Sequence, residues 1–281
     1  MSELFTSGNV ATNSDLAFWG NWAFVGYYTG DTGSPPGSGP RGGVRIFDIS
    51  DPANPVMVRD FACDGQQNDP IVWDSDGNGV PDLLLLAIDR TMAGPECGAA
   101  RVAHGDPTGW EGIRIFEMSD DPASPFSTIQ QVGAVYQDCG SHTITLWPGK
   151  ADQGELIVYS SSYPLRPGPT CGQVNGPAAG RDPLHGVIQV VSVPLSDPAA
   201  AVEIAEPPIT YVGDPDNQID WCERGLCAPG ILEPAARACH DIVVHMASGL
   251  AAGACAEQGQ VWEIDANGIP DTANPVLVAD D

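Results

Sequence analysis

The stretch His142-Thr143-Ile144-Thr145-Leu146-Trp147 decides the fold class, because its pattern occurs four times in the 281-residue chain. In each copy a polar residue opens a short apolar run, and the run closes on an aromatic ring. The other three copies are Ser14 to Trp19, Asn68 to Trp73 and His240 to His245. Self-similarity of this kind is the signature of a repeat architecture. The segments that flank each copy should therefore repeat as well.

Three further apolar segments follow each opening stretch. In the first copy they are Trp22 to Tyr28, Val44 to Ile49 and Val56 to Phe61. Nearly continuous apolar strands are typical of sheets that are buried on both faces, and no segment has a convincing amphipathic helix period. Four strands in each of four repeats predict an all-β chain, namely a β-propeller of four-stranded blades in one domain over residues 1–281. The expected blades are residues 14–61, 68–135, 142–205 and 240–281.

Two forms of propeller fit this pattern. In one form the four blades close a ring by themselves. In the other the chain is a truncated arc of a larger propeller, because it stops at Asp281, where a fifth opening strand would begin. An open arc exposes apolar blade faces, so it is expected to self-associate.

The charge of the chain limits its partners. Its net charge of −26 comes from 37 acidic and 11 basic residues. An acidic surface repels phosphate backbones and anionic lipids, so we expect no nucleic-acid partner and no membrane-surface role. The alternative interpretation is that the charge only keeps the protein soluble or follows an acidic proteome. We also expect no membrane insertion, since no apolar run is long enough, and the start Met1-Ser2-Glu3-Leu4 is no secretory signal.

The eight cysteines follow the repeat. In three predicted pairs, one cysteine precedes an opening strand and the other lies in the next connection, and these two kinds of connection emerge on the same face of a propeller. A thiolate metal site is the alternative, but no CxxC pairs occur at zinc spacing. Disulfides imply a secreted or cell-surface protein whose leader is absent from this sequence. The predicted pairs are Cys63–Cys97, Cys139–Cys171, Cys239–Cys255 and, as a small ring, Cys222–Cys227.

Residues 74 to 82 have the spacing of a calcium loop. Oxygen-bearing side chains stand at loop positions one, three, five and nine, a glycine at six allows the sharp turn, and position seven offers a carbonyl. Position twelve is Leu85 instead of the glutamate of an EF-hand, so the loop resembles the calcium loops of dockerin and thrombospondin type-3 repeats. The alternative is an Asp/Gly hairpin turn without an ion, which is our interpretation of a weaker echo at Glu263 to Asp271. The predicted Ca²⁺ ligands are Asp74, Asp76, Asn78, Val80 and Asp82.

The first residues of the opening strands are expected to line the mouth of the central channel. Two imidazoles with neighbouring carboxylates suit a transition metal, or acid–base catalysis by His142, His240 and Asp241. The alternative is that these polar groups only hydrogen-bond the neighbouring blades. The chain lacks a GxSxG elbow, a Walker loop and a dinucleotide fingerprint in a suitable context. The candidate ligand-binding residues are Asn68, Asp69, His142, His240 and Asp241.

The segments Gly43 to Val56 and Gly112 to Asp120 resemble LVIVD-repeat proteins, whose repeats run through a strand, an acidic residue and an SDPxxP turn. Residues 139–143 and 239–242, the latter followed by Leu250 to Cys255, are similar to secreted bacterial members in particular. The resemblance implies a secreted or surface propeller. It implies little about function, and similar proteins usually continue into further repeats.

These patterns favour a secreted or cell-surface, calcium-stabilised propeller that acts as a binding module through its looped face. Its partner would be a protein, a glycan or a small molecule. The alternative is a metal-dependent hydrolase or oxidase that uses His142 and His240 at the channel mouth. The third hypothesis is a repeat protein with a purely structural role.

Overall fold

The computed structural model describes residues 12–28, 42–103, 106, 108–137, 140–161, 186–209, 239–255 and 258–280. Within these ranges the chain is all-β, with short 3₁₀ turns and no α-helix. Its strands form four antiparallel sheets of four strands each, and each sheet keeps the order of the sequence. The strands are β1 (Thr12–Trp19), β2 (Trp22–Tyr28), β3 (Gly42–Asp48), β4 (Val56–Ala62), β5 (Gln67–Trp73), β6 (Leu83–Met92), β7 (Trp110–Met118), β8 (Ile129–Tyr136), β9 (Thr143–Trp147), β10 (Glu155–Ser161), β11 (Gln189–Pro194), β12 (Val202–Ala205), β13 (Cys239–His245), β14 (Leu250–Cys255), β15 (Gln258–Glu263) and β16 (Leu277–Asp280).

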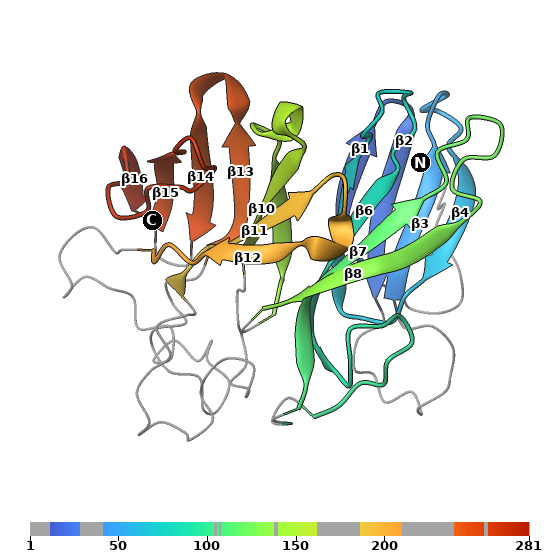
Figure 1. Ribbon diagram of the computed structural model, residues 1–281, viewed down its shortest axis with the longest axis horizontal. Helices are drawn as coiled ribbons and strands as arrows, with labels where there is room; N and C mark the ends of the chain where they lie inside the picture. The colour runs from blue at the N-terminus through green and yellow to red at the C-terminus, as the bar shows by residue number, and fades with distance from the viewer. Residues whose placement is uncertain are drawn as a thin grey trace.

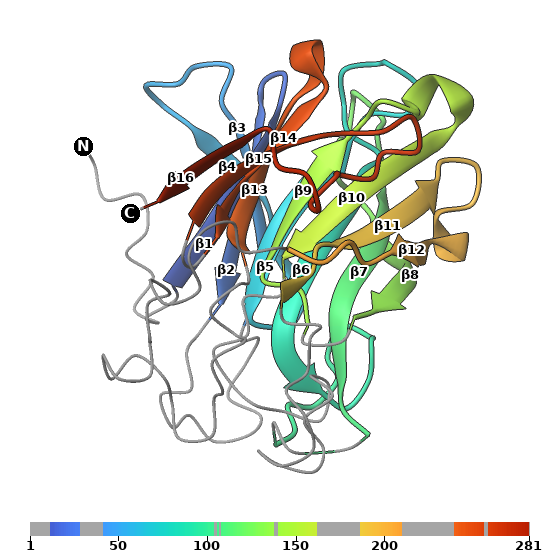
Figure 2. The same cartoon turned by 90° about the vertical axis from the view of Figure 1, so that its left-hand side faces the viewer.

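The sheets are arranged like the blades of a propeller. The first strand of each sheet lies innermost, and contacts between sheets join β1 to β5, β5 to β9 and β9 to β13. Figures 1 and 2 show the fourth strands at the periphery, with the first and last sheets at opposite ends of the long axis. Four antiparallel sheets with the first strand of each innermost therefore agree with the all-β, propeller-like fold predicted from the sequence.

A tight turn joins the first two strands of the first sheet. Between β1 and β2, Trp19 pairs with Trp22, so the hairpin loop contains only Gly20 and Asn21. Gly20 has a φ of 54°, a left-handed backbone that glycine adopts without steric cost. This tight turn fixes the register of the first hairpin.

The second sheet is buried on both of its faces. Consecutive side chains of a strand point to opposite faces, so Leu84 and Leu85 on β6 face different neighbours. Leu84 packs with Phe24 of the first sheet, and Leu85 packs with Val158 of the third. Both leucines are fully buried. Continuous burial explains why β6 has an unbroken apolar run where a half-exposed strand would alternate.

The third and fourth sheets meet at a cluster of buried aromatic side chains. Trp147 and Tyr159 of the third sheet pack with Trp262 of the fourth. The Tyr159 hydroxyl donates a 2.8 Å hydrogen bond to the carbonyl of Gly268. A buried tyrosine usually finds such a partner for its polar end.

Two of the predicted disulfides are confirmed. Cys63 is bonded to Cys97, and Cys239 is bonded to Cys255. The predicted pairs Cys139–Cys171 and Cys222–Cys227 lie outside the described residues. In the part of the chain that the structure describes, no helix has the length and apolar character needed to cross a membrane.

Truncating Leu85 should destabilise the fold. Leu85→Ala removes buried methyl groups between two sheets, and we expect it to lower the free energy of unfolding by about 2 to 5 kcal/mol. Urea titration followed by tryptophan fluorescence measures this loss. Leu277→Ala is the matched control, because Leu277 on β16 is 60% exposed, and it should cost far less. Equal losses for the two variants would contradict burial of β6 on both faces.

Candidate functional site

The starts of the four innermost strands bring the predicted channel-mouth residues together in space. We call this set the rim; it consists of Ser14, Asp15, Asn68, Asp69, His142, Thr143, His240 and Asp241. In three of the four first hairpins the strand register is interrupted there, between Asn13 and Leu16, between Gln67 and Pro70, and between Cys239 and Asp241. Such bulges re-aim side chains and are frequent beside functional sites. The rim residues thus leave the regular pleat where the sheets converge.

The backbone at the start of β5 is strained. Gln67 and Asn68 have φ values of 71° and 55°, in the left-handed region that non-glycine residues seldom adopt. Asn68 is fully buried, and its Nδ2 donates a 2.9 Å hydrogen bond to the carbonyl of Tyr27 in the first sheet. Its Oδ1 is buried without a hydrogen-bond partner in the structure. Backbone strain of this kind persists only where its surroundings enforce it.

Asp69 links the second sheet to the third. Its Oδ2 accepts a 2.7 Å hydrogen bond from the backbone N–H of Ile144 on β9. Burial raises the pKa of Asp69 well above its ordinary value, against the lowering effect of the Ile144 bond, and the nearby charges of Asp15 and Asp241 raise it further. The rim therefore contains a carboxyl group that favours its neutral form.

His142 and His240 form an imidazole pair between the third and fourth sheets. Their Nε2 atoms are 3.2 Å apart. His142 Nδ1 lies 2.6 Å from Asp89 Oδ2, and the Thr143 hydroxyl donates a 2.5 Å hydrogen bond to the His240 carbonyl. His240 is an exposed residue, but partial desolvation of its ring lowers its pKa, and the neighbouring His142 lowers it further, whereas Asp241 and Asp15 oppose this shift.

This arrangement allows two kinds of chemistry. One imidazole can donate its Nε2 proton to the other, which gives a proton-sharing pair that Asp89 orients. Alternatively both Nε2 atoms can face one cation, since two ligands at about 2.0 to 2.1 Å in tetrahedral geometry lie roughly 3.3 Å apart. A carboxylate on the far nitrogen is also typical of metal-bound histidine. However, within the described ranges no group of three or more His, Cys, Asp or Glu side chains converges as a metal site.

Asp89 is a part of the site that the sequence reasoning missed. It lies on β6, directly after the apolar run Leu83 to Ile88. A charged residue that interrupts so long a buried run was the available signal, because buried carboxylates need a partner. Its Oδ2 contacts His142, and its Oδ1 is buried with no hydrogen-bond partner in the structure.

The predicted calcium loop folds as a series of side-chain-to-backbone turns. Asp74 Oδ1 accepts a 2.7 Å hydrogen bond from the Gly77 amide, and Asp74 Oδ2 accepts one of 2.8 Å from the Gly79 amide. Partial burial raises the pKa of Asp74, but the hydrogen bonds from Gly79, Gly77, Trp19 and Asn78 outweigh it and lower the pKa overall.

The other predicted ligands of the loop are hydrogen-bonded in the same manner. The Asn78 amide donates to Asp76 Oδ1 at 2.9 Å, and the Ser75 amide donates to Asp82 Oδ1 at 3.1 Å. Asp265 accepts two similar bonds in the echo loop, where the sequence predicts no ion. Amide bonding therefore does not by itself distinguish a calcium loop from a turn, and calcium binding stays a prediction.

Comparison with known proteins identifies no family for this chain. No protein-family model matches it, and no curated protein matches it. Membership in the LVIVD-repeat family therefore stays a prediction.

Solved structures give only weak similarities. A protein from Lactobacillus plantarum has 10% identity and a TM-score of 0.44, over 95% of this chain and 71% of that chain. A functionally unknown protein from Desulfotomaculum acetoxidans has 9% identity and a TM-score of 0.40, over 96% and 70%. A candidate 6-phosphogluconolactonase from Bacteroides fragilis has 8% identity and a TM-score of 0.41, over 92% and 68%. At such scores and identities, no argument about this chain rests on them.

Replacing Asp69 should change how stability depends on pH. Because its native pKa is raised, Asp69 contributes its full stability below the unfolded-state pKa of 3.8 and loses that contribution as the pH rises through the native pKa. Asp69→Asn does not titrate and can still accept the Ile144 hydrogen bond. As the pH rises between the two pKa values, the free energy of unfolding of the variant relative to that of the wild type should increase by about 1.4 kcal/mol per pH unit.

Urea unfolding at a series of pH values measures this difference. Titration of His240 occurs in both proteins, so it largely cancels. Asp152→Asn is the matched control, since Asp152 lies exposed in the turn after β9 and should not produce the same trend. A difference between Asp69→Asn and wild type that stays flat with pH would refute the raised pKa.

Proposed function

We propose that this protein is a secreted or cell-surface, calcium-stabilised propeller of the LVIVD-repeat kind, and that its rim is the ligand-binding site of a binding module. The observation that carries the proposal is the convergence of His142 and His240 from separate sheets, with Nε2 atoms 3.2 Å apart. The His142 amide donates a 2.8 Å hydrogen bond to the carbonyl of Ser161, the last residue of β10, so the pair lies near the start of the long β10–β11 connection. Loops positioned by a rigid scaffold commonly carry function. His240 is exposed and reaches solvent, so a ligand can approach it.

The charge around the pair restricts the chemistry of the ligand. The negative charges of Asp15 and Asp241 lie close enough to His240 to favour its protonated form, and the whole chain has a net charge of −26. An acidic site raises the local concentration of cations and repels anions. Hydroxyl groups and amines can donate to the carboxylates and imidazoles. The proposed ligand is therefore a neutral glycan or a basic peptide, and not a nucleic acid.

A metal-dependent enzyme is the second candidate. It is supported by the Nε2 separation together with the Asp89 carboxylate on His142 Nδ1. His142 and His240 would hold the metal, Asp89 would orient His142, and the metal would supply Lewis-acid polarisation or an activated water. His142, His240 and Asp241 are the candidate catalytic residues in that case.

Removing the two imidazoles should weaken ligand binding. We expect the wild type to bind members of an array of neutral glycans and basic peptides, and the double variant His142→Gln/His240→Gln to bind them at least about tenfold more weakly, a loss of about 1.4 kcal/mol. His245→Gln is the matched control, because His245 stands at the far end of β13 from His240. Equal binding by the double variant would overturn the rim as the site. Elemental analysis of the same samples separates the candidates: a stoichiometric transition metal that only the double variant loses would favour the enzyme.

Calcium removal should lower thermal stability if the aspartate loop binds the ion. A ligand that binds only the folded state at about one hundred times its Kd adds about 2.7 kcal/mol. We expect a chelator to lower the melting temperature at low ionic strength and added Ca²⁺ to restore it. Asp76→Asn/Asp82→Asn should remove this response, whereas Asp265→Asn in the echo loop should keep it. A melting temperature that the chelator leaves unchanged would remove calcium from the proposal.

A further inference from the structure

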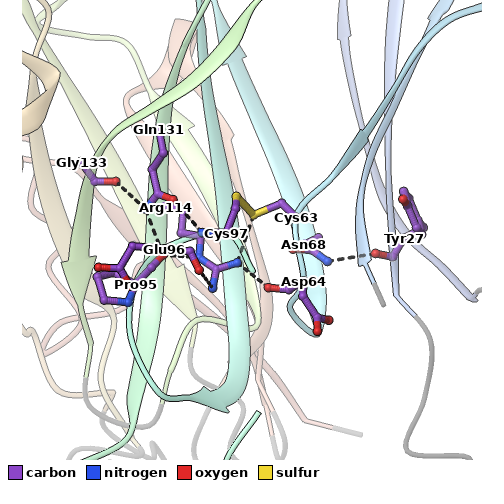
Figure 3. Close-up of a disulfide and its surroundings, with 10 residues drawn as sticks. All are labelled: Tyr27, Cys63, Asp64, Asn68, Pro95, Glu96, Cys97, Arg114, Gln131 and Gly133. Carbon is purple, nitrogen blue, oxygen red and sulfur yellow. Dashed lines mark hydrogen bonds between the residues drawn. A yellow bond between two sulfur atoms is a disulfide. The ribbon is translucent and has the colours of Figure 1, made fainter. Parts of the chain in front are cut away.

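A buried guanidinium touches the Cys63–Cys97 disulfide (Figure 3). Arg114 on β7 is fully buried, and one of its terminal nitrogens donates a 3.1 Å hydrogen bond to Cys63 Sγ. Burial lowers the pKa of Arg114 to about 10, against the opposing charges of Asp64 and Glu96. The guanidinium is therefore cationic at neutral pH. A positive charge beside a sulfur stabilises its thiolate form.

The same arginine ties together the two loops that the disulfide connects. On one side it donates a 2.5 Å hydrogen bond to the carbonyl of Asp64, and on the other its Nε donates one of 2.6 Å to the carbonyl of Pro95. The Cys97 amide in turn donates to Gln131 Oε1 at 3.0 Å. These bonds do not involve the sulfur–sulfur bond, so they can hold the loops in place when it opens.

The two sulfurs differ in access. Cys63 is 1% exposed, whereas Cys97 is only half-buried. Cys97 is therefore the more accessible of the two to an incoming thiolate. Attack on Cys97 makes Cys63 the leaving group, and a leaving thiol whose pKa is lower leaves faster. Access and charge thus favour the same direction of exchange.

We propose that Cys63–Cys97 is a thiol–disulfide exchange site, which a small thiol opens by attack on Cys97 and which closes again without unfolding of the protein. In the first step the thiolate bonds to Cys97 Sγ, the sulfur–sulfur bond breaks, and its electron pair leaves on Cys63 Sγ beside Arg114. In the second step another thiolate attacks the mixed disulfide and releases Cys97 as a thiolate. Two thiols are oxidised to one disulfide, and the cystine takes up the two electrons. Closure is the reverse reaction, in which the small-molecule disulfide is the oxidant and is reduced to two thiols. The site does not depend on what the rim binds.

The second described disulfide provides an internal comparison. Cys239 is 2% exposed and Cys255 is half-buried, so access is similar. Cys63 and Cys239 both pack in apolar core clusters, so apolar burial is also similar. The difference is that Cys63 Sγ accepts a hydrogen bond from the Arg114 guanidinium. Cys239 instead lies beside Trp262 and pairs with Cys255 across β13 and β14. A cation beside a sulfur lowers the pKa of its thiol and makes it a faster leaving group, so the guanidinium is what should make Cys63–Cys97 open faster.

Exposure to 2-mercaptoethanol tests the proposal on the intact wild-type chain. Samples are quenched with an alkylating reagent, and the modified peptides are identified by mass spectrometry while circular dichroism follows the fold. We expect Cys63–Cys97 to open at least about tenfold faster than Cys239–Cys255, with mercaptoethanol attached to Cys97 and an unchanged spectrum. When the disulfide of mercaptoethanol then replaces the thiol, it supplies the oxidant and the bond should close again. Attachment mainly to Cys63, equal rates for the two disulfides, or opening only together with unfolding would each overturn it.

Two arginine variants isolate the role of the charge. We expect Arg114→Gln to slow the opening of Cys63–Cys97 at least about fivefold and Arg114→Lys to slow it less. Arg59→Gln is the matched control, because Arg59 is exposed on β4 and should leave the rate unchanged. An unchanged rate in a folded Arg114→Gln protein would refute the role of the guanidinium. If that variant does not fold, the position of attachment and the relative rates in the wild type still decide the proposal.

Discussion

Burial of both faces of the second sheet is the constraint on which the rest of the structure depends. Leu84 and Leu85 are consecutive and fully buried, and they pack against different neighbouring sheets. A sheet with two apolar faces cannot stand alone in water, because each face must be covered. Covering both faces draws the innermost strands together. The polar starts of those strands must then meet, and this is how the rim arises.

The rim holds the sheets together and supplies titratable groups at the same place. Asp69 accepts a hydrogen bond from β9, and Thr143 donates one to β13, so both link neighbouring sheets. Titration of Asp69 and titration of His240 change the stability with opposite signs. The lowered pKa of His240 costs stability as the pH falls, whereas the raised pKa of Asp69 costs stability as the pH rises. Groups that stabilise the assembly thus also make it responsive to pH.

The third strand of every sheet has a long polar side chain at one equivalent position, and its contacts differ from sheet to sheet. Arg45 stacks over the ring of Tyr27 at 4.1 Å from its centroid. Arg114 contacts a disulfide and two loops, and Gln260 accepts a 3.0 Å hydrogen bond from Trp262 Nε1. The repeat fixes where a long polar side chain stands, and the neighbouring loop decides what it does. The equivalent positions are Arg45, Arg114, Gln189 and Gln260, which pair with Val25, Leu86, Ser160 and Gly253 of the second strands.

The tertiary structure decided which individual atoms meet at the rim and around the disulfide. His142 and His240 are 98 positions apart, and their contact depends on how two sheets pack. Asp89 and Arg114 are charged residues in largely apolar strands, and their partners come from other sheets or loops. The left-handed backbone at Asn68 has no local signal such as glycine. Side-chain direction there follows from bulges and inter-sheet packing, which no local sequence period encodes.

The sequence by itself determined the strands, their grouping into four antiparallel sheets, and the pairing of Cys63 with Cys97 and of Cys239 with Cys255. These features follow from the apolar pattern and its repetition, because a repeated pattern places equivalent residues on the same face of equivalent sheets. The chemistry of the site follows from distances between sheets. Those distances are set only when the apolar faces close on one another.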